Sequence, residues 1–202
     1  MIKGELDMGK MYKMFLLSVA VCIVLNGCAG GPAAETERNG SVEGLGDVTY
    51  SENEVADSPI VFEGYDMDGN AVSSEIFAES KLTMVNVWAT YCNPCLREMP
   101  GLGELANEYD DETFQIIGVV SNVQEGTDQE TMNLLADLIE KTEADYTHLL
   151  INESIYYALL TDVAAVPTTF FVNADGVILD TVVGSMDKSA WEEKINELLE
   201  EQ

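Results

Sequence analysis

The stretch WATYCNPC, residues 88–95, decides how the rest of the chain is interpreted. An apolar run rich in β-branched residues, 82–88, leads into it, and a helical pattern follows it. Two cysteines separated by two residues at the junction of a strand and a helix form a redox motif. Residues three apart lie on one face of an α-helix, so Cys92 and Cys95 can close a disulfide with little backbone motion.

The start of a helix offers unpaired N–H groups and the positive end of the helix dipole, which favour a thiolate over a thiol. We therefore predict that Cys92 is an exposed nucleophile with a lowered pKa. Cys95, inside the first helical turn, is predicted to be the resolving thiol.

Charge and cysteine content narrow the classes of function. The 202 residues carry a formal net charge of −28, which argues against nucleic-acid binding because that needs a basic face. We interpret the charge as a solubilising surface. A structural zinc site usually takes four cysteine and histidine ligands. The folded part offers only Cys92, Cys95 and His148, so we predict neither a metal nor a cofactor.

The N-terminal residues have the pattern of an export signal. Three lysines lie within residues 1–13, and an apolar run of twelve residues follows at 14–25. This run is too short to span a bilayer but suits a signal-peptide core. It ends in Leu-Asn-Gly-Cys at 25–28, which resembles a bacterial lipobox. We predict a lipoprotein signal peptide at 1–27, lipidation of Cys28, and a location on the extracytoplasmic face of the cell membrane. An ordinary signal peptide or an uncleaved anchor is the alternative.

The remainder divides into a linker and one domain. Residues 28–57 are rich in Gly, Ala, Glu, Asn and Ser, which predicts a flexible tether. Hydrophobic periodicity across 58–202 alternates strands with helices, the pattern of an α/β domain whose central sheet is covered on both faces. The predicted strands are 60–62, 71–73, 82–88, 114–120, 148–151, 168–173 and 177–183. The predicted helices are 93–109, 128–143 and 154–160, and a last one opens with a capping box at Ser189-Ala190-Trp191-Glu192.

Two motifs in this order resemble the thioredoxin superfamily, in particular its membrane-anchored TlpA/ResA-like branch. The first is the stretch 88–100, in which Arg-Glu-Met-Pro follows the cysteine pair, and the second is Ala-Val-Pro-Thr-Thr-Phe at 165–170. The resemblance covers residues 58–202. It implies a thioredoxin-like fold with a central mixed β-sheet flanked by helices. It also implies an N-terminal β-hairpin and a mid-domain helical insertion around 128–143.

The resemblance also implies the residues of a site. Pro167 would be cis and pack beside the cysteine pair. The backbone of Val166 would pair with an extended segment of substrate, and Tyr91 would keep an aromatic wall next to Cys92. Trp88, Asn93 and Pro94 would support the site: Trp88 mainly by packing, and Pro94 because its fixed φ suits a first helical turn.

Two positions depart from the thioredoxin-like pattern. Asn86 stands where thioredoxin has a buried aspartate, and an asparagine cannot relay a proton. ResA-like proteins carry a glutamate that we align with the hairpin, where this chain has Ser73, with Glu75 two residues on. The proton that Cys95 must lose therefore has no assigned carrier in the sequence.

The resulting prediction is a lipid-anchored, monomeric protein-disulfide reductase that uses the Cys92/Cys95 dithiol. Its partners would be proteins containing disulfides and a CcdA-like membrane electron donor. A disulfide-forming oxidase would use the same pair. A Sco-like copper chaperone needs three residues between its cysteines and a distant histidine, for which only His148 is available. A peroxiredoxin would want a proline and a Thr or Ser where Val85 and Ala89 stand. A purely structural disulfide is the remaining alternative.

Overall fold

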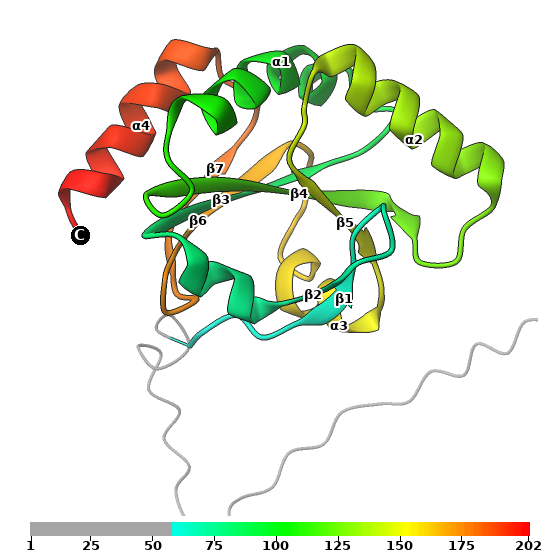
Figure 1. The fold of residues 1–202 in the computed structure, drawn as a ribbon, viewed down its shortest axis with the longest axis horizontal. Helices are drawn as coiled ribbons and strands as arrows, with labels where there is room; N and C mark the ends of the chain where they lie inside the picture. The colour runs from blue at the N-terminus through cyan, green and yellow to red at the C-terminus, as the bar shows by residue number, and fades with distance from the viewer. Residues whose placement is uncertain (1–57) are drawn as a thin grey trace, which may run out of the picture. The chain divides into compact units, whose positions relative to one another are not determined.

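A computed structural model describes residues 58–202, so the predicted signal peptide at 1–27, the lipidation site Cys28 and the tether at 28–57 lie outside the described residues. The elements follow one another as in Figure 1. They are β1 (Glu63–Tyr65), β2 (Ala71–Ser73), η1 (Ser74–Glu79), β3 (Leu82–Trp88), α1 (Asn93–Glu108), β4 (Phe114–Gln124), α2 (Gln129–Thr142), β5 (Thr147–Ile151), α3 (Glu153–Ile155), η2 (Tyr156–Leu160), β6 (Thr168–Asn173), β7 (Ile178–Val183) and α4 (Lys188–Glu200). From residue 58 to the end, no helix has the length and apolarity that a membrane span requires.

The main sheet has five strands in the order β5-β4-β3-β6-β7. β3 pairs in parallel with β4 and antiparallel with β6, which makes the sheet mixed. β1 and β2 form a separate antiparallel hairpin. All seven residues of β3 are buried, as expected for a central strand covered on both faces. The predicted thioredoxin-like architecture, with its hairpin and its inserted helix α2, is confirmed.

Side chains of β3 alternate between two layers of core. Val85 and Val87 belong to the cluster beneath the hairpin, η1 and α3, whereas Met84 and Trp88 belong to the clusters beneath the helices. Figure 1 shows α1, α2 and α4 on one side of the sheet and the hairpin, η1 and α3 on the other. Because side chains of a strand alternate, Asn86 lies on the same face as Met84 and Trp88, towards α1.

Two local predictions were wrong, and each for a definable reason. Residues 60–62 are not a strand: Ile60 donates its N–H to the carbonyl of Gly176, and the first strand starts at Glu63. Ser189 does not cap α4. The helix begins at Lys188, and its N-cap is Asp187, two residues before Ser189. The carboxylate of Asp187 accepts from the N–H of Ala190 at 3.0 Å, because an aspartate is as good an N-cap as a serine.

Other details agree with the sequence or extend it. Asp128 caps α2 by accepting from the N–H of Thr131 at 2.9 Å; the sequence offered Thr127 or Asp128 for this position. β4 runs to Gln124, past its predicted end at Val120. Pro100 lies inside α1 without ending it.

Candidate active site

The two cysteines lie at the junction of β3 and α1. Cys92 is the N-cap of α1, and Asn93 and Pro94 form the first turn, where a proline loses no intrahelical hydrogen bond. Cys92 and Cys95 are joined in a disulfide, so the structure is that of the oxidised protein. The N–H of Cys95 donates to the sulfur of Cys92 at 3.3 Å. In the reduced protein this donor would stabilise a thiolate on Cys92.

The two sulfurs differ in access. Cys92 is 6% exposed and Cys95 is fully buried. The prediction of an exposed Cys92 was therefore too strong, because the surrounding loop covers most of its surface. Cys92 is nevertheless the more accessible member of the pair, as the division into nucleophile and resolving thiol requires.

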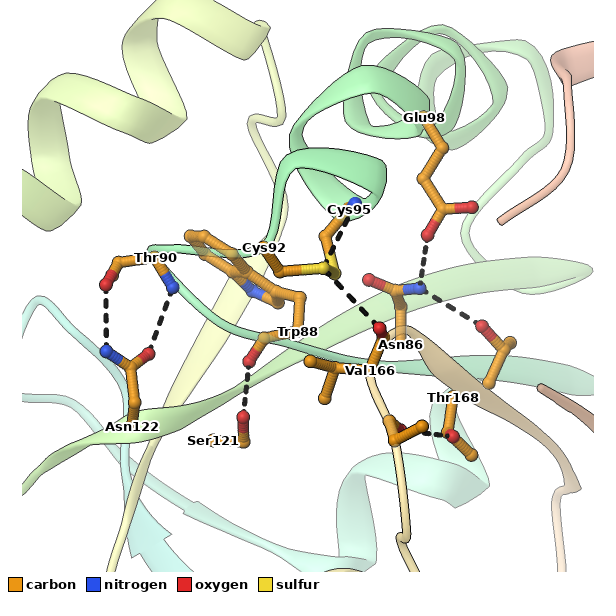
Figure 2. The surroundings of a disulfide bond; sticks show 12 residues. Asn86, Trp88, Thr90, Cys92, Cys95, Glu98, Ser121, Asn122, Val166 and Thr168 are labelled. Carbon is orange, nitrogen blue, oxygen red and sulfur yellow. Dashed lines mark hydrogen bonds between the residues drawn. A yellow bond between two sulfur atoms is a disulfide. The ribbon is translucent and has the colours of Figure 1, made fainter. Parts of the chain in front are cut away.

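Hydrogen bonds fix the loop that carries Cys92. The N–H of Thr90 donates to Asn122 Oδ1 at 3.0 Å, and Asn122 Nδ2 donates back to Thr90 Oγ1 at 2.8 Å. The hydroxyl of Ser121 donates to the carbonyl of Trp88 at 2.9 Å. Figure 2 shows these contacts on the side of the disulfide away from Asn86. The end of β4 thus holds the approach to Cys92 in one conformation.

Trp88 is fully buried and packs in one cluster with Cys92 and Cys95. Its indole N–H donates to His148 Nδ1 at 3.2 Å, and His148 Nε2 lies 3.0 Å from the carbonyl of Ala144. Both ring nitrogens are satisfied when the histidine is neutral with its proton on Nε2. Burial lowers the pKa of His148 to about 4, so the ring is neutral at physiological pH. His148 is a satisfied core residue.

The loop before β6 completes the site. The peptide bond between Val166 and Pro167 is cis, as the resemblance implied. The carbonyl oxygen of Val166 lies 3.6 Å from the sulfur of Cys92 (Figure 2). The hydroxyl of Thr168 donates to the carbonyl of Ala165 at 2.8 Å and so ties the loop to the start of β6. The Val166–Pro167 peptide therefore lies beside the accessible cysteine.

A groove opens next to Val166. It is a cavity of about 480 Å³, lined by Tyr91, Ser121, Gln124, Ile151, Tyr156, Leu160, Thr161, Val163, Ala164, Ala165 and Val166. Tyr91 is 72% exposed and Tyr156 is 48% exposed. The π-helical turn η2 carries Tyr156 and Leu160, and π-turns are often found at functional sites. The sequence identified Tyr91 and Val166, but it gave no reason to connect them with η2.

A buried carboxyl group lies one helical turn after Cys95. Glu98 is almost inaccessible, and three donors point at it. Its Oε1 accepts from Asn86 Nδ2 at 3.2 Å, and its Oε2 accepts from the N–H of Met186 at 3.1 Å and from the indole N–H of Trp191 at 3.3 Å. Burial raises the pKa of Glu98 above its usual range, and the three hydrogen bonds offset only part of that effect.

The buried carboxyl of this site belongs to Glu98 of α1 and not to a residue of the hairpin. Ser73 accepts from the N–H of Glu75 and starts η1, on the face of the sheet opposite α1. The buried carboxyl that shares a layer with the disulfide comes instead from α1. Its position three residues after Cys95 was a usable signal, because that spacing puts both side chains on one face of a helix.

Comparison with known proteins defines the family. A family model described as the AhpC/TSA family matches residues 55–181, more than half of the chain. The chain belongs to the AhpC/TSA family. The AhpC/TSA chain is 32% identical over 119 residues to the thioredoxin-like protein YneN of Bacillus subtilis, which covers 59% of this chain and 66% of YneN. It is 28% identical over 128 residues to the thiol-disulfide oxidoreductase ResA of Halalkalibacterium halodurans, covering 63% and 68% of the two chains.

Solved structures give the same fold. A thiol:disulfide interchange protein of Chlorobium tepidum superimposes with a TM-score of 0.57 at 21% identity, over 71% of this chain and 96% of the other. The chain spans about two thirds of the length of the curated relatives described above. The resemblance to the ResA-like branch and the thioredoxin-like fold are therefore confirmed for this AhpC/TSA protein.

Proposed function

We propose that this protein reduces disulfide bonds of substrate proteins through the Cys92/Cys95 dithiol, outside the cytoplasm and from a lipid anchor. By its family and by the names of its relatives, the chain is a thiol-disulfide oxidoreductase. The roles of nucleophile and resolving thiol are assigned from the difference in burial between Cys92 and Cys95. Cys92 is the accessible sulfur and receives the N–H of Cys95, whereas Cys95 is buried beneath it.

The exchange uses these positions in order. The thiolate of Cys92 attacks one sulfur of the substrate disulfide, and the other substrate sulfur leaves as a thiolate that takes a proton from water. Cys95 then loses its proton and attacks Cys92, which releases the second substrate thiol and leaves the disulfide seen here. Glu98 is the buried carboxyl one turn from Cys95, and we assign it the proton that Cys95 loses, because burial raises its pKa above the usual range and so favours its protonated form.

The groove is the proposed binding site for the substrate. The backbone of Val166 and Pro167 would hold the segment that carries the substrate cysteine, and Tyr91 and Tyr156 would contact its neighbouring side chains. Tyrosine suits this role because it offers apolar area with a polar tip. Asn93 and Pro94 shape the helix start that presents Cys92.

The setting outside the cytoplasm rests on the sequence. A signal peptide at 1–27 that is followed by Cys28 would place the domain on the outer face of the membrane, tethered by residues 28–57. A reductase in that compartment needs electrons from across the membrane, and we propose that a CcdA-like membrane protein donates them. We also propose that this protein accepts them as a monomer. Changing Cys28 to Ser should release the protein into the soluble fraction. Continued membrane attachment of the variant would contradict lipidation at this residue.

Trapping tests the exchange mechanism. The Cys95→Ser variant, expressed in its native host, should accumulate mixed disulfides between Cys92 and substrate proteins, because the resolving thiol is absent. The Cys92→Ser variant is the matched control and should trap none. Equal trapping by both variants, or none by Cys95→Ser while Cys92 still reacts with a thiol reagent, would contradict the assigned roles.

The reduction potential of the pair separates a reductase from an oxidase. A potential near that of thioredoxin, about −270 mV, is expected for a reductase, and one near that of DsbA, about −120 mV, would favour the disulfide-forming alternative. Equilibration of the protein with dithiothreitol mixtures of known ratio measures it.

A further inference from the structure

One acceptor beneath the disulfide has no partner. Asn86 is fully buried in the middle of β3, yet within residues 58–202 its side-chain oxygen Oδ1 receives no hydrogen bond. Buried side-chain oxygens are nearly always paired, because an unpaired one has lost its hydration without a replacement. An exception of this kind calls for an explanation. In a redox protein, a group that is unpaired in one oxidation state can find its hydrogen-bond partner in the other.

The orientation of the amide is fixed by its other end. Asn86 Nδ2 donates to Glu98 Oε1 at 3.2 Å and to Thr169 Oγ1 at 3.1 Å. An ionised carboxylate only accepts hydrogen bonds, so turning the amide over would set Oδ1 against Glu98 Oε1. Glu98 and Thr169 therefore direct Oδ1 away from themselves.

Oδ1 is directed towards the disulfide. Asn86 lies on the α1 face of β3, two residues before Trp88, which packs in one cluster with Cys92 and Cys95. Figure 2 shows its nitrogen turned to Glu98 and its oxygen turned to the sulfur atoms. Cys95 is as deeply buried as Asn86, so bulk water does not reach its sulfur. A sulfur in a disulfide carries no hydrogen, which leaves Oδ1 without a donor in the oxidised protein.

We propose that reduction supplies the missing donor: the thiol of Cys95 donates its S–H to Asn86 Oδ1. This rests on the proposed exchange through Cys92 and Cys95. A dithiol reductant gives two electrons and two protons to the disulfide and becomes a disulfide itself. One proton leaves Cys92, which becomes the thiolate stabilised by the N–H of Cys95, and the other stays on Cys95.

The hydrogen bond distinguishes the two thiols chemically. Accepting from the neutral thiol favours that form of Cys95, just as a donor to Cys92 favours its thiolate. Cys95 then stays protonated and unreactive while Cys92 attacks the substrate. Asn86 does not take the proton. It holds the thiol with Oδ1 and contacts Glu98 with Nδ2, so that one amide connects the buried thiol with the buried carboxyl.

Infrared spectroscopy of the S–H stretch tests this directly, because the band moves to lower wavenumber when the thiol donates. The full-length Cys92→Ala variant has a free Cys95 and no second polar group at position 92. Subtracting the spectrum of Cys92→Ala/Cys95→Ala removes the bands of Cys22 and Cys28. The difference band should lie below that of ethanethiol in hexane, which has no acceptor. A band at the hexane position overturns the proposal.

Variants at position 86 identify the acceptor. In the Cys92→Ala background, Asn86→Leu removes the oxygen while keeping the branching and number of side-chain heavy atoms, and it should move the band up to the hexane position. Asn86→Asp keeps an oxygen in place and should leave it low. A low band that persists in a folded Asn86→Leu variant shows another acceptor and overturns the proposal. If Asn86→Leu does not fold, the comparison with ethanethiol still decides. None of these spectra requires turnover, so failure of the reductase assay and failure of this inference are separate results.

Discussion

The hydrogen bond from Trp191 to Glu98 provides a quantitative test of the buried carboxyl. Trp191 is fully buried near the start of α4, and its indole N–H donates to Glu98 Oε2 at 3.3 Å. The Trp191→Phe substitution removes this donor and keeps an aromatic ring in place. Oε2 then retains only the N–H of Met186. A hydrogen bond to a charged group contributes about 1.5–3 kcal/mol. Because 3.3 Å is at the long end of the range, the lower part, about 1.5–2 kcal/mol, is expected.

The loss of stability caused by Trp191→Phe should increase as pH rises. Burial already raises the pKa of Glu98 in the folded protein, and loss of a donor to the carboxylate raises it further. Below the unfolded pKa of 4.5 the carboxyl is protonated in both states, and the variant shows the packing loss of the smaller ring together with the loss of a hydrogen bond to a neutral carboxyl. As pH rises through the folded pKa, the unfolded chain ionises more readily than the folded one, so stability falls, and it falls further in the variant.

Urea unfolding followed by circular dichroism at pH 4 to 8 measures this difference. The free energy of unfolding of Trp191→Phe relative to wild type should decrease by a further 0.5–1 kcal/mol, roughly, between the acidic and neutral ends, which is the excess of a hydrogen bond to a carboxylate over one to a neutral carboxyl. Phe171→Leu is a matched control, because Phe171 packs against Trp191 in the same cluster without a hydrogen bond to Glu98. Its cost should be the same at both ends. An equally flat profile for Trp191→Phe would refute the carboxylate hydrogen bond, and with it the argument that these donors restrain the pKa of Glu98.

Three further outcomes follow from other parts of the structure. Between pH 6.5 and 4 the unfolded chain binds a proton that folded His148 does not. Over that range the unfolding free energy of wild type relative to His148→Leu should therefore fall by on the order of 3 kcal/mol in acid urea titrations, and a constant difference between the two would contradict the low pKa of His148. Gly103→Ala should lower the melting temperature despite alanine's better helix propensity, because its Cβ would collide with the backbone carbonyl of Glu143. Gly101→Ala should lower it much less, because the nearest neighbour of Gly101 is a lysine side chain. A calorimetric scan of both variants measures the difference. Tyr156→Ala should lower kcat/KM for a protein disulfide about tenfold, as expected for an aromatic contact worth about 1.4 kcal/mol. The rate with a small aromatic disulfide should not change. Equal loss on both substrates would place Tyr156 outside the substrate groove.

Local chemistry was enough to predict most of the fold. The buried run 82–88 has the length and β-branching of a central strand, and the structure has it as β3 with every residue buried. Asp128 and the periodic apolar positions after it defined α2. The errors fall where neighbouring residues offer equivalent local solutions. Asp187 and Ser189 are both good caps, and only the packing of α4 decides between them. Residues 60–62 have strand propensity, but tertiary contacts with Gly176 use the backbone of Ile60 in another way.

The site was predictable where its residues are adjacent in sequence or belong to a recognisable motif. Cys92, Cys95 and the Val166–Pro167 peptide are found together as expected. The groove was not predictable, because Tyr156 is brought to Tyr91 only by the way η2 packs under the end of the sheet. A single sequence gives no signal for a contact of that kind, since propensity and periodicity describe one segment at a time.

The buried carboxyl shows how such a contact changes the chemistry. Asn86, Met186 and Trp191 are far from Glu98 in sequence, and they divide unequally between its two oxygens. Oε2 receives two donors, which occupy both of its lone pairs, whereas Oε1 receives only Asn86 and keeps one lone pair. A proton taken up by Glu98 therefore binds on Oε1, the oxygen on the side of Asn86. The open lone pair of the carboxyl is therefore on the oxygen that contacts Asn86, whose own amide oxygen faces the disulfide. This places the exchangeable proton between β3 and α1, in the layer that also holds Cys95.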